Sequence, residues 1–153
     1  MKVVIQRVSE ANVTIDNKIY NSIENGLMVL VGFTEGDNSL DIDYVVKKIC
    51  NLRIFDDENG VMNKSVIDVC GSILSISQFT LYADTRKGNR PSYLRALKGD
   101  LSCGLYNEFN KKLNELVPTK TGIFGADMKV SLVNNGPTTI IIDSSERNKS
   151  RNA

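Results

Sequence analysis

One stretch limits the fold of this chain more than any other, the apolar run at residues 27–33, Leu-Met-Val-Leu-Val-Gly-Phe. It is far shorter than the roughly 18 apolar residues that a membrane-spanning helix needs. A short, continuous apolar run is typical of a strand that is buried on both faces of a sheet. The chain has 153 residues, which is enough for one domain with a real core around this strand.

Other segments show the periodicity of strands or of helices. Alternation of apolar residues predicts strands at residues 2–8, 11–16, 19–23, 73–82, 128–132 and 138–142. Asn17-Lys18 falls where a two-residue hairpin turn would join two of these strands. Apolar residues recur every three to four positions in two segments, which predicts amphipathic helices at residues 42–52 and 101–116. In the second helix we expect the buried face to run from Leu101 to Leu116.

The order of these elements predicts the fold class. Strands and helices do not alternate regularly, which argues against a doubly wound parallel sheet. We expect an α+β fold, with a mainly antiparallel sheet or partly closed β-barrel and two flanking amphipathic helices. A single domain is expected at residues 1–143, followed by a polar, frayed C-terminal tail at residues 144–153.

The chain contains no histidine, which limits its chemistry. Ser-His-Asp and Cys-His catalysis and His-ligated zinc are excluded. Three cysteines, Cys50, Cys70 and Cys103, cannot build a four-cysteine zinc site, and their wide spacing predicts a reducing compartment, the cytoplasm. We expect no metal, no cofactor, no signal peptide and no membrane contact. Hydroxyls, carboxylates, lysines, backbone N–H groups or the substrate must supply the chemistry.

Polar groups gather in Ser77-Gln78-Phe79-Thr80-Leu81-Tyr82, at the end of a predicted strand. Its alternation is also that of any half-buried strand. As a site, it offers the hydroxyls of Ser77 and Thr80 as nucleophiles, without a histidine to activate them. Alternatively, backbone N–H groups and the Gln78 amide could stabilise an oxyanion.

The loop that follows is basic, although the net charge of the chain is only +1. Residues 86–98 contain no acid and five cations, Arg86, Lys87, Arg90, Arg95 and Lys98. A local basic patch can bind phosphates without a high overall charge. A solvated loop with scattered charges explains the same pattern equally well.

Gly136-Pro137 separates the last two predicted strands. A plain hairpin loop explains it, because Asn-Gly is a strong turn signal and proline can end a strand. A cis peptide is the alternative, although only about 5–6% of X–Pro bonds are cis. The residues alone therefore favour the trans peptide, without deciding its state.

Four motifs, in order, resemble the D-aminoacyl-tRNA deacylase family. They are Val4-Ile5-Gln6-Arg7-Val8, the segment from Ser77 through Tyr82 to Ser92, Phe124-Gly125-Ala126-Asp127-Met128, and Val133-Asn134-Asn135-Gly136-Pro137. The resemblance covers essentially residues 1–143. It implies an enzyme that hydrolyses the ester between a D-amino acid and the terminal adenosine of tRNA, and that also removes mischarged glycine. It further implies a small β-barrel assembled as a homodimer with active sites at the interface.

The resemblance also assigns roles to residues. Ser77, Gln78, Phe79 and Thr80 are expected to line the pocket for the ester and the adenosine. Gly136-Pro137 resembles a cis Gly-Pro element that enters the active site of the opposite subunit, where main-chain carbonyls hold the substrate amino group and exclude L side chains.

Whether the ribose 2′-OH or the Thr80 hydroxyl carries the chemistry stays open. Arg86, Lys87 and Arg90 are candidate contacts for tRNA phosphates. A non-catalytic, dimeric tRNA-binding module is the alternative function.

Overall fold

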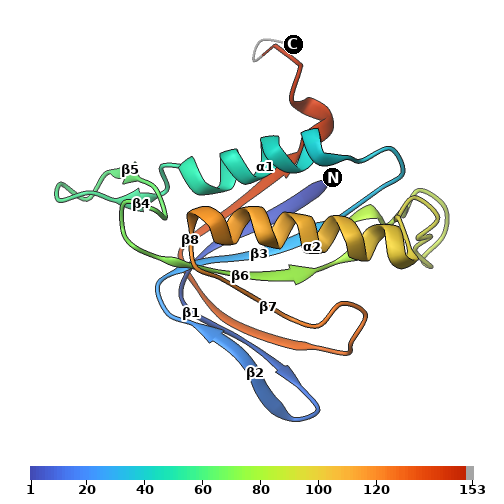
Figure 1. The fold of residues 1–153 in the computed structure, drawn as a ribbon, viewed down its shortest axis with the longest axis horizontal. Helices are drawn as coiled ribbons and strands as arrows, with labels where there is room; N and C mark the ends of the chain where they lie inside the picture. Colours follow the sequence, from blue (N-terminus) through green and yellow to red (C-terminus); the bar gives the residue numbers. More distant parts are fainter. Residues whose placement is uncertain (151–153) are drawn as a thin grey trace.

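The computed structural model describes residues 1–150 and shows a sheet curved into a partly closed barrel, with two helices packed beside it (Figure 1). The strands are β1 (Lys2–Ile15), β2 (Lys18–Ile23), β3 (Gly26–Gly32), β4 (Phe55–Asp56), β5 (Met62–Lys64), β6 (Ser72–Ser77), β7 (Thr119–Thr121) and β8 (Lys129–Asp143). The helices are α1 (Ser39–Asn51) and α2 (Gly99–Leu116), and two short 3-10 helices are η1 (Phe79–Tyr82) and η2 (Ser144–Glu146).

The main sheet is mixed. Its strand order is β2-β1-β3-β6-β7, and β8 pairs with β1. β1 pairs antiparallel with β2, β3 and β8, whereas the β3–β6 and β6–β7 pairs are parallel. The predicted α+β class with a mainly antiparallel, partly closed barrel and two helices is confirmed, and the sheet is mixed rather than purely antiparallel. Parallel pairs arise because α1 lies between β3 and β6, and α2 between β6 and β7, so each connection crosses over.

Two apolar clusters stabilise this arrangement. The predicted buried run is β3, and its side chains at Leu27, Val29 and Val31 are fully buried. They pack with α1 and α2 on one face of the sheet. The second cluster lies on the other face of the sheet and combines Met28 of β3 with Val8 and other residues of β1, β2 and β6. Burial on both faces of β3 follows from these two layers.

Helix α1 forms where its sequence predicts it. Asn38 caps its first turn: the side chain accepts a hydrogen bond from the Leu40 N–H, and Asp41 bonds back to the Asn38 N–H. The buried face carries the predicted apolar residues from Ile42 to Ile49.

Helix α2 buries the middle of the predicted face but not its ends. Phe109 and Leu113 are buried as predicted, whereas Leu101 and Leu116 are exposed and Ser102 and Tyr106 are buried as well. The Tyr106 hydroxyl lies 2.8 Å from the Ser75 carbonyl oxygen of β6, to which it donates a hydrogen bond. A buried tyrosine needs such a partner, and this contact helps to orient α2 against the sheet.

The first hairpin turns one residue earlier than predicted. Asp16 and Asn17 join β1 to β2, with φ angles of 51° and 61°. Both residue types tolerate this left-handed conformation, which a two-residue hairpin turn needs.

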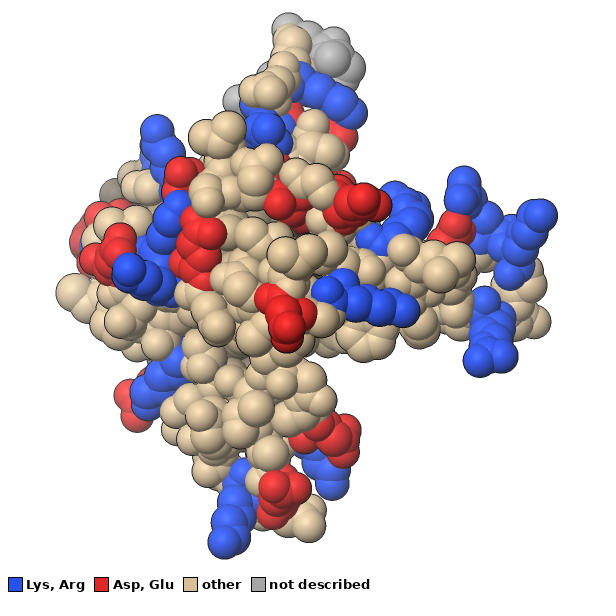
Figure 2. All heavy atoms as spheres, turned by 45° about the vertical axis from the view of Figure 1, so that its right-hand side comes forward, with Lys and Arg blue, Asp and Glu red and all other residues tan. Residues whose placement is uncertain are grey.

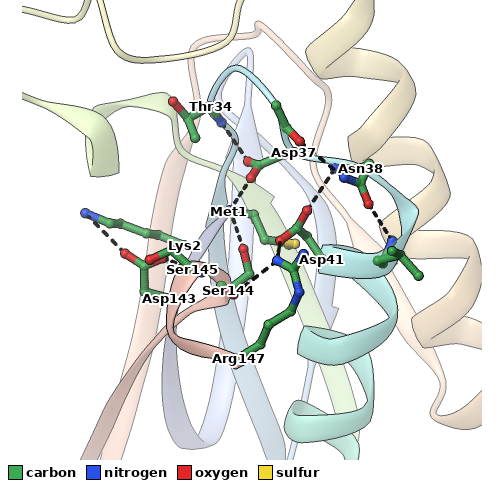
Figure 3. Close-up of polar contacts among 12 residues, drawn as sticks. Met1, Lys2, Thr34, Asp37, Asn38, Asp41, Asp143, Ser144, Ser145 and Arg147 are labelled. Atoms are coloured by element: carbon green, nitrogen blue, oxygen red, sulfur yellow. Dashed lines mark hydrogen bonds and ion pairs between the residues drawn. The ribbon is translucent and has the colours of Figure 1, made fainter. Parts of the chain in front are cut away.

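The two ends of the described chain meet beside α1 (Figure 3). The Met1 α-ammonium donates hydrogen bonds to Asp37 Oδ1 at 2.5 Å and to Ser144 Oγ at 2.7 Å. Arg147 forms an ion pair with Asp41 at the start of α1. The expected frayed tail is therefore wrong at Ser144, which is 1% exposed, and at Arg147. Residues 151–153 of that tail lie outside the described residues. None of the described helices combines the length and apolarity needed to cross a membrane.

Candidate active site

The stretch predicted as a strand through Tyr82 leaves the sheet at Ser77. Ser77 ends β6, and the Gln78 N–H donates the next bond, at 2.7 Å, to the Val31 carbonyl oxygen of β3. Residues 79–82 then form η1 instead of a strand. β3 ends at Gly32, so the backbone groups of residues 79–82 have no neighbouring strand with which to pair. They bond within the turn, as in the 3.0 Å bond from Ala83 N to the Thr80 oxygen.

Leaving the sheet brings the polar groups of this stretch together. Gln78 Nε2 donates a hydrogen bond to Thr80 Oγ1 at 2.5 Å. The Phe79 side chain is half exposed and meets the Tyr93 ring edge-on, with 5.1 Å between the ring centroids. The Thr80 oxygen is thus an acceptor, and within residues 1–150 no hydrogen bond from its hydroxyl to a base occurs.

A pocket of about 390 Å³ opens beside this stretch. Ser77, Gln78 and Phe79 form one wall. A second wall is the loop at residues 124–128, and a third is the start of α2. The volume lies within the range of small-molecule sites, about 300–1,000 Å³. Three of the four residues expected around the ester therefore share one pocket, and Thr80 is hydrogen-bonded to one of them.

Gly136-Pro137 lies in a bulge of β8, not in a hairpin. Val8 pairs with Asn134 and Gln6 with Thr139, so residues 135–138 form the bulge between two halves that both pair with β1. The Gly136-Pro137 peptide is cis. Gly136 and Pro137 are both exposed, and neither lines the pocket beside Ser77 of the same chain.

Arg7, which the sequence analysis did not assign as functional, ties this bulge to the rest of the fold. Its Nε donates to the Asn135 carbonyl oxygen at 3.1 Å, and its Nη1 donates to the Ile54 carbonyl oxygen at 2.6 Å. Arg7 is only 8% exposed. The signal in the sequence is a charged residue within the apolar alternation of residues 2–8. A buried arginine of this kind needs acceptors, and the bulge supplies one.

The basic loop projects from the molecule, and Lys and Arg side chains gather on the projection at the right of Figure 2. Asp84 and Ser92 exchange backbone bonds of 2.8 and 2.9 Å that close the loop. Arg86, Lys87 and Arg90 surround a hollow of about 520 Å³ there.

The structure divides the five cations of residues 86–98. Arg86 pairs with Asp84, and this contact lowers the pKa of that carboxyl to about 2. Arg95 lines the hollow beside Met1, and Lys98 lines the pocket beside Ser77. The patch proper therefore consists of three of the five cations. Within residues 1–150, no three His, Cys, Asp or Glu side chains gather in a way that could hold a metal ion.

Comparison with known proteins identifies the class of this molecule. The model of the D-Tyr-tRNA(Tyr) deacylase family matches residues 4–143. A solved structure named c-Myc DNA Unwinding Element Binding Protein is 39% identical, with a TM-score of 0.89, over 94% of this chain and 98% of that one. A probable eukaryotic D-amino acid tRNA deacylase is similar in fold, with a TM-score of 0.79 and 16% identity over 92% of this chain and 97% of that one.

These matches place the protein among the hydrolases that act on aminoacyl-tRNA esters. The chain belongs to the D-Tyr-tRNA(Tyr) deacylase family, and its activity is that of a D-aminoacyl-tRNA deacylase.

Proposed function

We propose that this enzyme proofreads chirality in translation: it hydrolyses D-aminoacyl-tRNA, spares L-aminoacyl-tRNA and also clears mischarged glycyl-tRNA. The observation that carries the proposal is the pocket bounded by Ser77, Gln78 and Phe79, with Gly136-Pro137 exposed outside it on the same chain. The substrate and three free cysteines are consistent with action in the cytoplasm.

In this proposal the nucleophile is a water molecule, and the tRNA itself assists its attack. Thr80 Oγ1 already accepts a hydrogen bond from Gln78, which reduces its nucleophilicity, and the chain has no histidine to activate it. The 2′-OH of the terminal ribose is next to the ester and orients the water, whose oxygen bonds to the carbonyl carbon while the bond to the ribose 3′-oxygen breaks and that oxygen takes up the proton. The protein holds the ester, and the backbone N–H groups of Phe79 and Thr80, with the second N–H of the Gln78 amide, stabilise the oxyanion.

Stereochemical choice comes from a second copy of the chain. In a homodimer, Gly136-Pro137 of one subunit enters the pocket of the other and offers main-chain carbonyls to the substrate amino group. A rigid backbone there leaves no room for an L side chain, so selection works by rejection. Arg7 and the hydrogen bonds of Asn134 to the Arg7 and Thr138 carbonyl oxygens support that rigidity.

The direct test compares D-Tyr-tRNA, L-Tyr-tRNA and mischarged Gly-tRNA as substrates of the purified protein. Release of D-tyrosine and glycine with retention of L-tyrosine is expected. A D-Tyr-tRNA that ends in 2′-deoxyadenosine should resist hydrolysis, whereas Thr80→Val should keep most of the activity. Equal hydrolysis of the D and L esters would contradict the proofreading role.

Subunit mixing tests where Gly136-Pro137 acts. Gly136 has a φ of 124°, and a Cβ there would lie 2.8 Å from Arg7 Nη2, so Gly136→Ala should displace the bulge. Gln78→Ala should disable the pocket of its own subunit. If the bulge acts on the opposite subunit, randomised dimers of the two inactive variants regain about a quarter of wild-type activity, because half are mixed and each has one intact site. If the mixture stays inactive, the bulge does not act across subunits.

Nucleic-acid binding in addition to deacylation is the second candidate function. The basic hollow at Arg86, Lys87 and Arg90 favours it, and the 39% identical relative is named for binding a DNA element. Measuring tRNA affinity and ester hydrolysis in one preparation separates the two functions. Binding of uncharged tRNA that survives the loss of ester hydrolysis in Gln78→Ala would favour a separate binding function.

A further inference from the structure

The start of α2 opens into the pocket without a capping side chain. Lys98 occupies the N-cap position with extended backbone, and its side chain makes no capping hydrogen bond. The first N–H groups of a helix have no partner within the helix and carry a partial positive charge. Lys98 and Gly99 line the same pocket as Ser77 and Gln78. The pocket thus has an electropositive end.

An unpaired hydroxyl is available to a ligand at this end. Ser102, in the first turn of α2, is 5% exposed and lines the pocket, yet no hydrogen bond of its hydroxyl occurs within the described chain. Two other buried serines, Ser65 and Ser144, are hydrogen-bonded through their hydroxyls. The hydroxyl of Ser75 is also unpaired, but it is enclosed in the core of β6 and does not line the pocket, whereas the Ser102 oxygen is not enclosed. The one hydroxyl of these four that is both unpaired and open to the pocket can therefore bond to a ligand there.

The charges around the pocket restrict where an anion can bind. Lys98 has no ion-pair partner among the described residues. Asp100 adds a negative charge in the first turn of α2. Asp127 lies at the edge that the pocket shares with a second hollow near Asp16. Asp127 disfavours an anion near itself, which leaves the end formed by Lys98 and Ser102, where the exposed Asp100 does not line the pocket.

We infer that the N-terminus of α2, with Lys98 and Ser102, binds the phosphate group on the 5′ side of the terminal adenosine. The inference rests on the proposed function, because it takes the nucleoside ester to occupy the same pocket. The phosphate is covalently attached to that nucleoside, so one pocket must accommodate both. Free backbone N–H groups, an ammonium and a hydroxyl are the donors that phosphate oxygens accept from.

The test compares two small esters, 3′-O-(D-tyrosyl)adenosine and the same compound with a 5′-methyl phosphate. Wild type should show a kcat/KM at least about fivefold higher for the phosphorylated ester, since hydrogen bonds to charged groups are worth roughly a factor of ten. Lys98→Ala and Ser102→Ala should each bring the ratio between the two esters toward one. Lys111→Ala, on an exposed position of the same helix, is the control and should keep the wild-type ratio.

A ratio is used because a purely structural role would change both rates together. A wild-type ratio near one, or a high ratio that survives both substitutions, would overturn the phosphate site while leaving deacylation intact. If neither ester is hydrolysed, the proposed function fails instead. Calorimetric affinities for adenosine and its 5′-methyl phosphate then still test the site, with tighter binding of the phosphate expected in wild type and lost in Lys98→Ala.

Discussion

At the scale of single residues, Arg7 connects more of the molecule than any candidate site residue. Its guanidinium bonds to the carbonyl oxygens of Ile54 and Asn135 and lies 3.4 Å from Asp56. Two segments far apart in the sequence, the β4 region and the β8 bulge, therefore depend on one buried side chain. A position that satisfies several buried carbonyls in this way cannot be replaced by an apolar residue of similar size.

We expect Arg7→Met to destabilise the protein by about 2–3 kcal/mol, because the buried carbonyl oxygens lose charged donors. The urea midpoint of unfolding measures the change. Arg53→Met is the control, since Arg53 bonds to Asn63 on an exposed surface and should change stability by less than about 0.5 kcal/mol. If the two substitutions lowered the free energy of unfolding equally, the hydrogen bonds of Arg7 would not be what connects the β4 region to the β8 bulge.

Asp84 gives a prediction in acid. The Arg86 side chain lowers its pKa to about 2, from 3.8 in the absence of partners. A carboxyl whose folded pKa is depressed stabilises the fold above its unfolded pKa, and this contribution is lost as the pH falls through the folded value. The loop should therefore loosen between about pH 4 and pH 2.

Titration of Asp84 by NMR should show a midpoint near 2 in wild type and a higher midpoint in Arg86→Gln. Exchange of the Ser92 amide, which bonds to the Asp84 carbonyl oxygen, should quicken over the same range. A midpoint that is the same in both proteins would show that Arg86 does not hold this carboxyl.

At the scale of elements, the residue pattern within a segment predicted those helices and strands whose formation depends on that segment alone. The continuous apolar run predicted β3, and the spacing of apolar residues predicted α1. Both predictions succeed because burial on two faces and a capped amphipathic helix can be recognised from residues that are neighbours in the sequence. The stretch at residues 77–82 alternates like a strand, yet η1 forms because β3 ends at Gly32. The length of a neighbouring strand is not visible in the stretch itself.

The candidate site was predictable to a similar extent. The resemblance named Ser77, Gln78 and Phe79, which share a pocket. Ser102 was not predicted as a site residue, because nothing in the sequence indicates that a serine within a helical segment is buried. The orientation of α2 depends in part on its contact with Ser75, and the bulge of β8 depends on the register with β1. Both are long-range properties, which periodicity alone does not report.

The parallel β3–β6 pair gives a test at this scale. A Cβ on Gly26 would lie 1.8 Å from the Ser72 carbonyl oxygen, so the strands could not keep their spacing. Gly26→Ala should cost about 3 kcal/mol or prevent folding. Gly104→Ala is the matched control: nothing lies within 4 Å of its added Cβ on α2, and it should stabilise the protein by up to about 1 kcal/mol. Thermal unfolding of both variants checks the contrast in sign.

At the scale of the whole molecule, the Met1 ammonium and Asp37 form a buried junction of the chain ends. The two side chains are 0% and 7% exposed, and Asp37 also accepts a hydrogen bond from the Thr34 N–H at 2.7 Å (Figure 3). Ser144 closes the junction by donating its N–H to the Met1 carbonyl oxygen. An ammonium buried in this way depends on its counter-charge.

Asp37→Asn should destabilise the protein by about 3 kcal/mol, because it leaves the Met1 ammonium buried without a negative partner. Differential scanning calorimetry measures the loss. Glu35→Gln, in the same loop but exposed, removes the same charge and should have little effect. If both substitutions lower the melting temperature equally, the ion pair is not what holds the ends.

The pairing of β1 has a consequence for how the protein is made. β1 is made before its antiparallel partner β8, which reaches from Lys129 to Asp143. Until residues near 143 emerge from the ribosome, one edge of a 14-residue strand stays open to solvent and to neighbouring nascent chains. Completion of the barrel therefore waits for the synthesis of β8. Slow synthesis would prolong the exposure of this edge, and a chaperone that shields extended segments would shorten it.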